Sequence, residues 1–287
     1  MRAIKINKKL STALKLIISF GLLYLVLRKI PLRELLSLWT QIEYQYLFLG
    51  AVLFLASQIL SAKRLEYYFG ASGFPLSFRS NLELYFLGMF YNFFIPGGIG
   101  GDAYKVYLLN KKFQWSLKKL TLSVLNDRIS GLVALLGLGV FITLLLFKSY
   151  WVLLLLILFI GLLIYNFILK KFFPSFQTLF AKGLLFSLAI QALQAISFVL
   201  LLTSLGVTSN FLPYALLFLA SSVLSLISFA GIGIREMLFL KASTYFHLDV
   251  TQSVSASLLF TVVTAFFALI GIVFQLRSLN LKTNSSI

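Results

Sequence analysis

Long apolar stretches dominate this sequence and constrain its fold more than any other feature. Each is about 20 residues long, and a helix of that length crosses the ~30 Å hydrocarbon core of a bilayer. With 60% hydrophobic and 11% charged residues among its 287, the chain has too little polar surface for a soluble domain of this size. We therefore expect an all-α polytopic membrane protein with six spanning helices, at residues 10–27, 46–62, 129–147, 151–169, 183–205 and 250–276.

The residue types present exclude several classes of chemistry. The chain has no cysteine and one histidine, His247, which argues against disulfides, thiolate metal sites and histidine-based metal centres. It also lacks the phosphate-binding motif GxxxxGK[ST], so we expect no ATP use by this chain, no metal and no cofactor. The basic N-terminus and first apolar stretch resemble a secretory signal. No small-residue cleavage site precedes Arg28 and Lys29, so we expect a retained first helix.

The net charge of +17 indicates how the helices are oriented. Most basic residues lie in short loops beside the apolar stretches, where they fix topology and attract anionic headgroups. We favour this interpretation over nucleic-acid binding because there is no soluble basic domain. Keeping the basic loops on one side places both termini in the cytoplasm. It also requires the segments around residues 91–109 and 213–247 to enter the membrane and return, from opposite faces.

Two short glycine-rich elements interrupt these two segments. They are PGGIGGD at residues 96–102 and FAGIGIR at residues 229–235, and each carries Gly-Ile-Gly followed by a charged residue, Asp102 or Arg235. Broken helices in inverted repeats build the binding sites of many transporters. We expect one domain, residues 1–287, with re-entrant breaks within residues 91–109 and 228–240 related as an inverted repeat. The alternative is that the glycines only permit close helix packing.

Charged residues within apolar segments are candidate binding groups, because they are costly in hydrocarbon. Asp127 and Arg128, near the start of the third spanning helix, form either a structural pair or a headgroup contact in which Asp127 orients Arg128. Asp102 and Arg235 carry opposite charges and are expected to face one cavity, where they can pair when the site is empty. Asn92, one turn before the first break, is expected either to cap a helix end, the role we favour, or to hydrogen-bond freed backbone.

Three ordered motifs, NFFIPGGIGGDAYKVYLL, VLNDRISGL and SFAGIGIREMLF, resemble those of the lysylphosphatidylglycerol synthase transmembrane-region family. This family includes the flippase-like membrane domain of the multiple peptide resistance factor. The resemblance extends from the first helix to the last. It implies that Lys105 is the basic residue after the first motif, where arginine is more usual. The second glycine element departs from the family pattern, having Ser228-Phe229-Ala230 in place of a proline and a glycine.

The residues and the resemblance together define a candidate translocation path with no catalytic residue. It comprises Asn92, Pro96, Gly97, Gly98, Gly100, Gly101, Asp102, Lys105, Asp127, Arg128, Gly231, Gly233, Arg235 and Glu236. No charged globular stretch follows residue 277, so we expect the stand-alone form, without the aminoacyl-transferase domain to which the family's best-known member is fused.

The leading functional hypothesis is a lipid translocase, or flippase, that moves an anionic phospholipid or glycolipid between leaflets. The alternatives are a non-transporting scaffold for envelope lipid or glycolipid synthesis and, less favoured, a membrane-embedded transferase. A transferase needs paired acids and larger loops than this chain has, so we expect no enzyme. The expected partners are membrane lipids and no nucleic acid, with a homo-oligomer or an envelope-synthesis enzyme left open. We expect a multi-pass protein of the prokaryotic plasma membrane.

Overall fold

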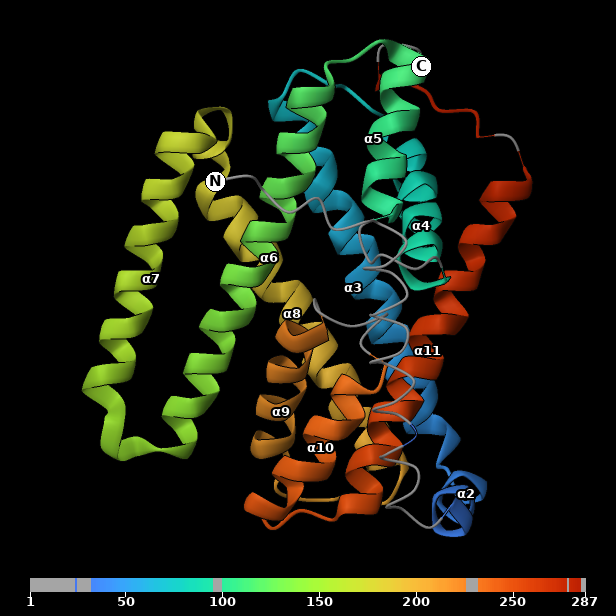
Figure 1. The fold of residues 1–287 in the computed structure, drawn as a ribbon, viewed down its shortest axis with the longest axis vertical. Helices are drawn as coiled ribbons and strands as arrows, with labels where there is room; N and C mark the ends of the chain where they lie inside the picture. Colours follow the sequence, from blue (N-terminus) through green and yellow to red (C-terminus); the bar gives the residue numbers. More distant parts are fainter. Residues whose placement is uncertain (1–23, 25–31, 95–99, 226–231, 278, 285–287) are drawn as a thin grey trace, which may run out of the picture.

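The computed structural model describes residues 24, 32–94, 100–225, 232–277 and 279–284, and nearly all of them are helical (Figure 1). The described part contains no strand, only an isolated antiparallel bridge between Leu76 and Thr283. The helices are α2 (Leu32–Thr40), α3 (Tyr44–Ala71), α4 (Phe78–Phe94), α5 (Gly100–Phe113), α6 (Leu117–Leu146), α7 (Trp151–Phe172), α8 (Phe180–Ser204), α9 (Phe211–Leu224), α10 (Ile234–Tyr245) and α11 (Val250–Leu276), with the short 3-10 turns η1 (Lys148–Tyr150) and η2 (Pro174–Leu179).

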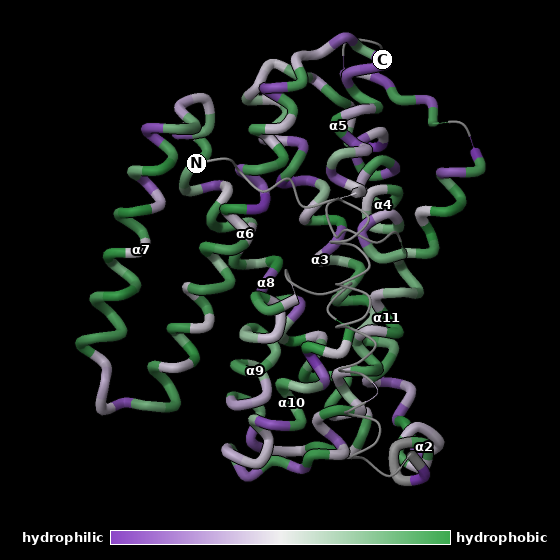
Figure 2. The backbone as a smooth tube through the Cα atoms, in the orientation of Figure 1, coloured by the Kyte–Doolittle hydropathy of each residue, from purple (hydrophilic) through white to green (hydrophobic). Residues whose placement is uncertain are grey.

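Five helical stretches are long and apolar enough to cross a membrane: Tyr44–Ala71, Leu117–Leu146, Lys148–Phe172, Pro174–Ser204 and Val250–Leu276. They contain five of the six predicted spans, which confirms the all-α polytopic membrane class. The remaining predicted span, residues 10–27, lies outside the described residues apart from Tyr24. Figure 2 shows hydrophobic residues along much of the length of these helices, as apolar lipid around them requires.

Most helix ends that carry lysine lie together at one end of the molecule; the exceptions are η1, which contains Lys148, and α10, which contains Lys241. The end of α5, the start of α6, the end of α7 and the start of α8 all lie at the top of Figure 1. Lys111, Lys112, Lys118, Lys119 and Lys170 are among the residues at these ends. This clustering is what the positive-inside rule requires of a cytoplasmic face.

Four shorter helices form two antiparallel pairs that enter the bundle from opposite ends. Helix α4 runs from the lysine-rich end towards the middle, and α5 returns to the same end; α9 and α10 do the same from the other end (Figure 1). Within each pair the helices pack against one another. The interruptions between Phe94 and Gly100 and between Leu224 and Ile234 overlap both predicted break regions. Their re-entry into a bilayer and their relation as a repeat stay predictions.

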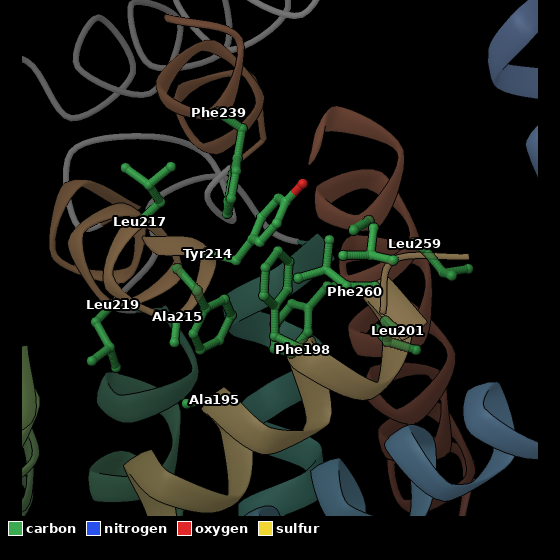
Figure 3. Packing of buried hydrophobic residues seen from close by; sticks show 14 of the residues in the cluster. Ala195, Phe198, Leu201, Tyr214, Ala215, Leu217, Leu219, Phe239, Leu259 and Phe260 are labelled. Atoms are coloured by element: carbon green, nitrogen blue, oxygen red, sulfur yellow. The ribbon is translucent and has the colours of Figure 1, made fainter. Parts of the chain in front are cut away.

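An aromatic cluster holds the second helix pair against the long helices (Figure 3). Phe198 of α8 stacks on Phe218 of α9 with ring centroids 4.8 Å apart, and Phe260 of α11 meets Phe218 edge-on at the same separation. Phe239 of α10 lies 5.2 Å from Phe198. All four side chains are buried. Inside a bilayer, where lipid is as apolar as these rings, such close packing is what favours association of the helices.

Single cysteines placed in exposed loops should report the orientation of these helices, because the natural chain has no cysteine. Ser116→Cys and Thr178→Cys lie at the lysine-rich end and should react with a membrane-impermeant maleimide only from the cytoplasmic side. Ser209→Cys, between α8 and α9, should react only from outside. Reaction of Ser116→Cys from outside would contradict both the re-entrant path of α4 and α5 and the orientation inferred from the lysines.

Candidate functional site

The main charged cluster lies where α5 begins, in the interior of the described structure. Asp102, in the first turn of α5, accepts a hydrogen bond from Lys105 Nζ at 3.1 Å through Oδ1. Its Oδ2 accepts from Arg128 Nε at 2.8 Å and lies 2.7 Å from Arg128 Nη2. Two cations from α5 and α6 therefore share one carboxylate, and the cluster carries one positive charge in excess.

The members of this cluster differ sharply in exposure. The side chains of Asp102 and Lys105 are 8% and 4% exposed, whereas that of Arg128 is 52% exposed. A buried carboxylate needs a counter-ion, because burial removes the water that would otherwise stabilise its charge. Lys105 provides that counter-ion from inside. Arg128 adds a second pairing from an accessible position.

Close contact between α4 and α5 positions the cluster. A Cβ atom at Gly101 would overlap the backbone carbonyl of Gly88, so the two helices meet through their backbones. The side chain of Asn92 accepts a hydrogen bond from the Gly101 amide at 2.8 Å. Asn92 thus bonds an amide in the first turn of α5, which agrees with both expected roles, capping and bonding backbone freed by the break. Lys105 crosses Gly88 and lies with Nζ 4.7 Å from the centre of the Tyr85 ring, a cation–π contact.

A second buried ion pair joins three long helices. Arg64 Nε of α3 donates to Asp127 Oδ1 of α6 at 2.7 Å, and Arg64 Nη1 donates to Ser187 Oγ of α8 at 2.7 Å. The expected pairing of Asp127 with Arg128 is therefore wrong. Neighbouring residues on a helix point in different directions, so Asp127 faces α3 and α8 while Arg128 faces α5.

The second break presents different chemistry. Gly233 has a φ of +81°, a left-handed conformation that favours glycine. The Glu236 carboxylate accepts hydrogen bonds from the Gly233 amide at 2.7 Å and from the Ser257 hydroxyl at 3.0 Å. Glu236 is fully buried, so its carboxylate caps the start of α10 and ties it to α11.

Arg235 has no carboxylate partner among the described residues. It is 8% exposed, and the carbon of its guanidinium lies 5.0 Å from the centre of the Phe260 ring and 5.9 Å from that of Phe218. Its Nε has no hydrogen-bond partner in the part of the chain that the structure describes. The expected pair between Arg235 and Asp102 is wrong, because Lys105 and Arg128 occupy both oxygens of that carboxylate.

The structure therefore brings together only part of the predicted path. Gly100 lies at the start of α5 beside the charged cluster, and Gly233 with Glu236 lies at the start of α10. Pro96, Gly97, Gly98 and Gly231 lie outside the described residues.

Sequence reasoning missed Arg64, Tyr85 and Ser187. Arg64 lies just beyond the predicted span 46–62, but α3 continues to Ala71. A detectable signal was present: Ser57, Ser61 and Arg64 follow helical spacing and form a polar stripe within an apolar segment. Such a stripe faces protein rather than lipid, and all three residues are buried.

The fold and the site define a polytopic membrane protein whose helical bundle encloses paired charges at a helix break. The family model for the lysylphosphatidylglycerol synthase TM region matches residues 12–271, and the chain belongs to this family. The family is a membrane domain associated with lipid handling. A comparison with curated proteins gives no match.

Gly101→Ala should destabilise the protein by about 1–3 kcal/mol, the usual cost of overpacking, because the added methyl group meets a backbone carbonyl that cannot rotate away. Gly100→Ala is the matched control. At that position the nearest atom to an added Cβ is the Tyr91 carbonyl oxygen, 4.0 Å away. Thermal unfolding in detergent, followed by tryptophan fluorescence, measures both. Equal midpoints for the two variants would show that α4 and α5 are not in backbone contact.

Arg64→Leu should destabilise the protein by about 3–5 kcal/mol, because it leaves the buried Asp127 carboxylate without a counter-ion. Adding Asp127→Leu removes both charges and should recover most of that loss. The same unfolding measurement tests the pair. If the double variant is destabilised by the sum of the losses in Arg64→Leu and Asp127→Leu, the two side chains do not interact.

Proposed function

We propose that this protein is a lipid translocase that moves an anionic phospholipid or glycolipid between the leaflets of the plasma membrane, acting as a transporter and not as an enzyme. Both termini face the cytoplasm in this proposal. Membership of a lipid-handling membrane family supports it. The observation that carries it is the uneven pairing of Asp102 with the buried Lys105 and the accessible Arg128.

This uneven pairing makes Arg128 an exchangeable cation. If Arg128 turns from Asp102 to a lipid phosphate, Asp102 keeps Lys105 as its counter-ion, so no buried carboxylate is left unpaired. A guanidinium suits this exchange because it offers planar, paired donors to carboxylate and phosphate alike. The lipid phosphate would then replace the Asp102 carboxylate as the anion bound to Arg128.

The depth of Arg128 favours a lipid-related role. It is the twelfth residue of α6, so it lies about 16 Å along the helix axis from the lysine-rich end. A charged side chain well inside the bilayer costs at least ~2.5–3.5 kcal/mol on insertion scales, and such residues usually serve function. Arg128 is half-exposed in the protein alone. A phosphate that enters with its lipid can therefore reach it.

Arg235 would provide a second anion contact in the other half of the bundle. Its guanidinium is buried against two aromatic rings and lacks a carboxylate among the described residues. Cation–π contact offsets only part of the cost of burying a charge. An anionic headgroup that comes within reach would supply the missing counter-charge, so the two breaks together would offer a cation on each half of the path.

Arg128→Gln should slow transport of a fluorescent phosphatidylglycerol in proteoliposomes by about tenfold or more, since charge-assisted bonds contribute about 1.5–3 kcal/mol each. Arg128→Lys should restore only part, because the paired geometry is lost. Lys118→Gln, an exposed charge loss on the same helix, is the control and should transport normally. Quenching of outer-leaflet fluorescence measures the rate.

Lys105→Gln distinguishes exchange of Arg128 between Asp102 and the lipid phosphate from simple attraction of an anionic lipid to positive charge. With Lys105 neutral, Arg128 becomes the only counter-ion of Asp102 and should leave it less readily, so transport should fall although Arg128 is intact. A non-transporting scaffold would show no dependence on either residue. We would abandon the translocase proposal if Arg128→Gln moved every tested lipid at the wild-type rate.

A further inference from the structure

Residues 279–284, which follow α11, pack against the start of α4. Figure 1 shows residues 279–284 at the lysine-rich end, beside α4 and α5. Leu281 is 4% exposed and lies in a cluster with Phe74, Leu76 and Leu84. This segment, residues 279–284, is therefore anchored by a buried side chain; we refer to it as the C-terminal segment.

Backbone hydrogen bonds fix the position of the C-terminal segment. The Ser77 amide donates to the Lys282 carbonyl at 3.0 Å, and the Lys282 amide donates to Ser80 Oγ at 2.8 Å. The Asn284 amide donates to the Pro75 carbonyl at 2.8 Å. Because these bonds use the backbone of Lys282, its exposed side chain remains available to a ligand.

A cavity of about 600 Å³ lies between the C-terminal segment, the start of α4 and the end of α11. This volume is within the range of small-molecule binding sites. Its walls combine charged and polar groups with apolar ones. The lining residues are Glu66, Ser77, Phe78, Arg79, Ser80, Glu83, Phe274, Arg277, Leu279, Asn280, Lys282 and Asn284.

The charges around this cavity do not cancel. Glu83 pairs with Arg79 at 3.3 Å, and Glu66 pairs with Lys63 at 2.6 Å. Arg277 and Lys282 have no carboxylate partner within the described part of the chain. The lining itself therefore carries one positive charge in excess, and Lys63 beside Glu66 adds a second. A fixed cavity with unpaired cations attracts an anion, and arginine beside lysine suits phosphate.

We propose that this cavity binds a phosphate group, held between Arg277 and Lys282, whose attached organic part lies against Phe78, Phe274 and Leu279. Arg79 is a third donor, since its side chain is 85% exposed and its bond to Glu83 is long. The phosphate can come from a lipid headgroup at the membrane surface or from a water-soluble phosphate ester. The site is separate from the Asp102 cluster and does not rest on the proposed transport.

Protection of a cysteine tests the site directly. Asn280→Cys places one thiol on the cavity wall without removing a charge. In the full chain in detergent, dihexanoyl-phosphatidylglycerol or glycerol phosphate should slow maleimide labelling of this thiol in a saturable way, and zwitterionic dihexanoyl-phosphatidylcholine should not. Labelling of Ser116→Cys, at the same end but outside the cavity, should be unaffected by all three compounds.

Removing the two unpaired cations should abolish most of this protection. In the Asn280→Cys chain, Arg277→Gln with Lys282→Gln should weaken apparent affinity by about tenfold or more, because both cations that hold the phosphate are lost. Lys118→Gln with Lys119→Gln removes equal charge from the same end and should leave affinity unchanged. Both replaced side chains are exposed. Each single substitution, with a smaller loss, provides a second measure should the double variant fail to fold.

The outcomes identify the source of the phosphate or overturn the proposal. Equal protection by glycerol phosphate and the anionic lipid supports a water-soluble ester, whereas protection by the lipid alone supports a headgroup. Equal protection by phosphatidylcholine overturns the proposal, because the site would then not recognise net negative charge. Unchanged protection in the Arg277 and Lys282 variants overturns it as well.

Discussion

The buried carboxylate of Asp102 is the constraint on which the first half of the structure depends. Its charge is stable in an apolar interior only while cations lie within hydrogen-bonding distance, and it has two. One comes from the next turn of α5 and the other from α6, so α5 has to be held close to α6 and at a fixed rotation. The backbone contact of Gly88 with Gly101 and the hydrogen bond from Gly101 to Asn92 provide that restraint.

Helix α6 connects this break to the rest of the bundle. Because consecutive helical residues point about 100° apart, Asp127 and Arg128 extend to different neighbours. Asp127 pairs with Arg64 of α3, which also bonds Ser187 of α8, whereas Arg128 reaches Asp102 of α5. The inner pair is sealed among the long helices and has no accessible member. The outer pair has one, because the Arg128 side chain is half-exposed, so two adjacent residues of α6 differ sharply in accessibility.

The sequence was sufficient to predict five of the long helices, the two interruptions and the presence of charged residues within apolar segments, such as Asp102 and Arg128, because these depend on local patterns. Hydropathy over about 20 residues and the cost of charge in hydrocarbon act within one segment. The partners could not be predicted in the same way. Whether Asp127 meets Arg128 or Arg64 depends on the rotation of α6 against α3, which is set by packing of residues 63 positions apart. The cation–π contact of Lys105 with Tyr85 depends likewise on the close approach of Lys105 to α4 that Gly88 permits.

The two breaks share a glycine pattern but not a balance of charge. At the first break, Asp102 pairs with two cations. At the second, the Glu236 carboxylate accepts hydrogen bonds from the start of α10 and from Ser257, while Arg235 lies against aromatic rings. At the first break two cations share one carboxylate, and at the second Arg235 forms no ion pair with a described carboxylate. The shared glycine pattern therefore predicted where charged groups enter the bundle. The surrounding helices determine whether such a group forms an ion pair, as Asp102 does, or none with a described residue, as for Arg235. The first break therefore carries one positive charge in excess, whereas at the second the charges of Arg235 and Glu236 sum to zero although the two side chains form no ion pair.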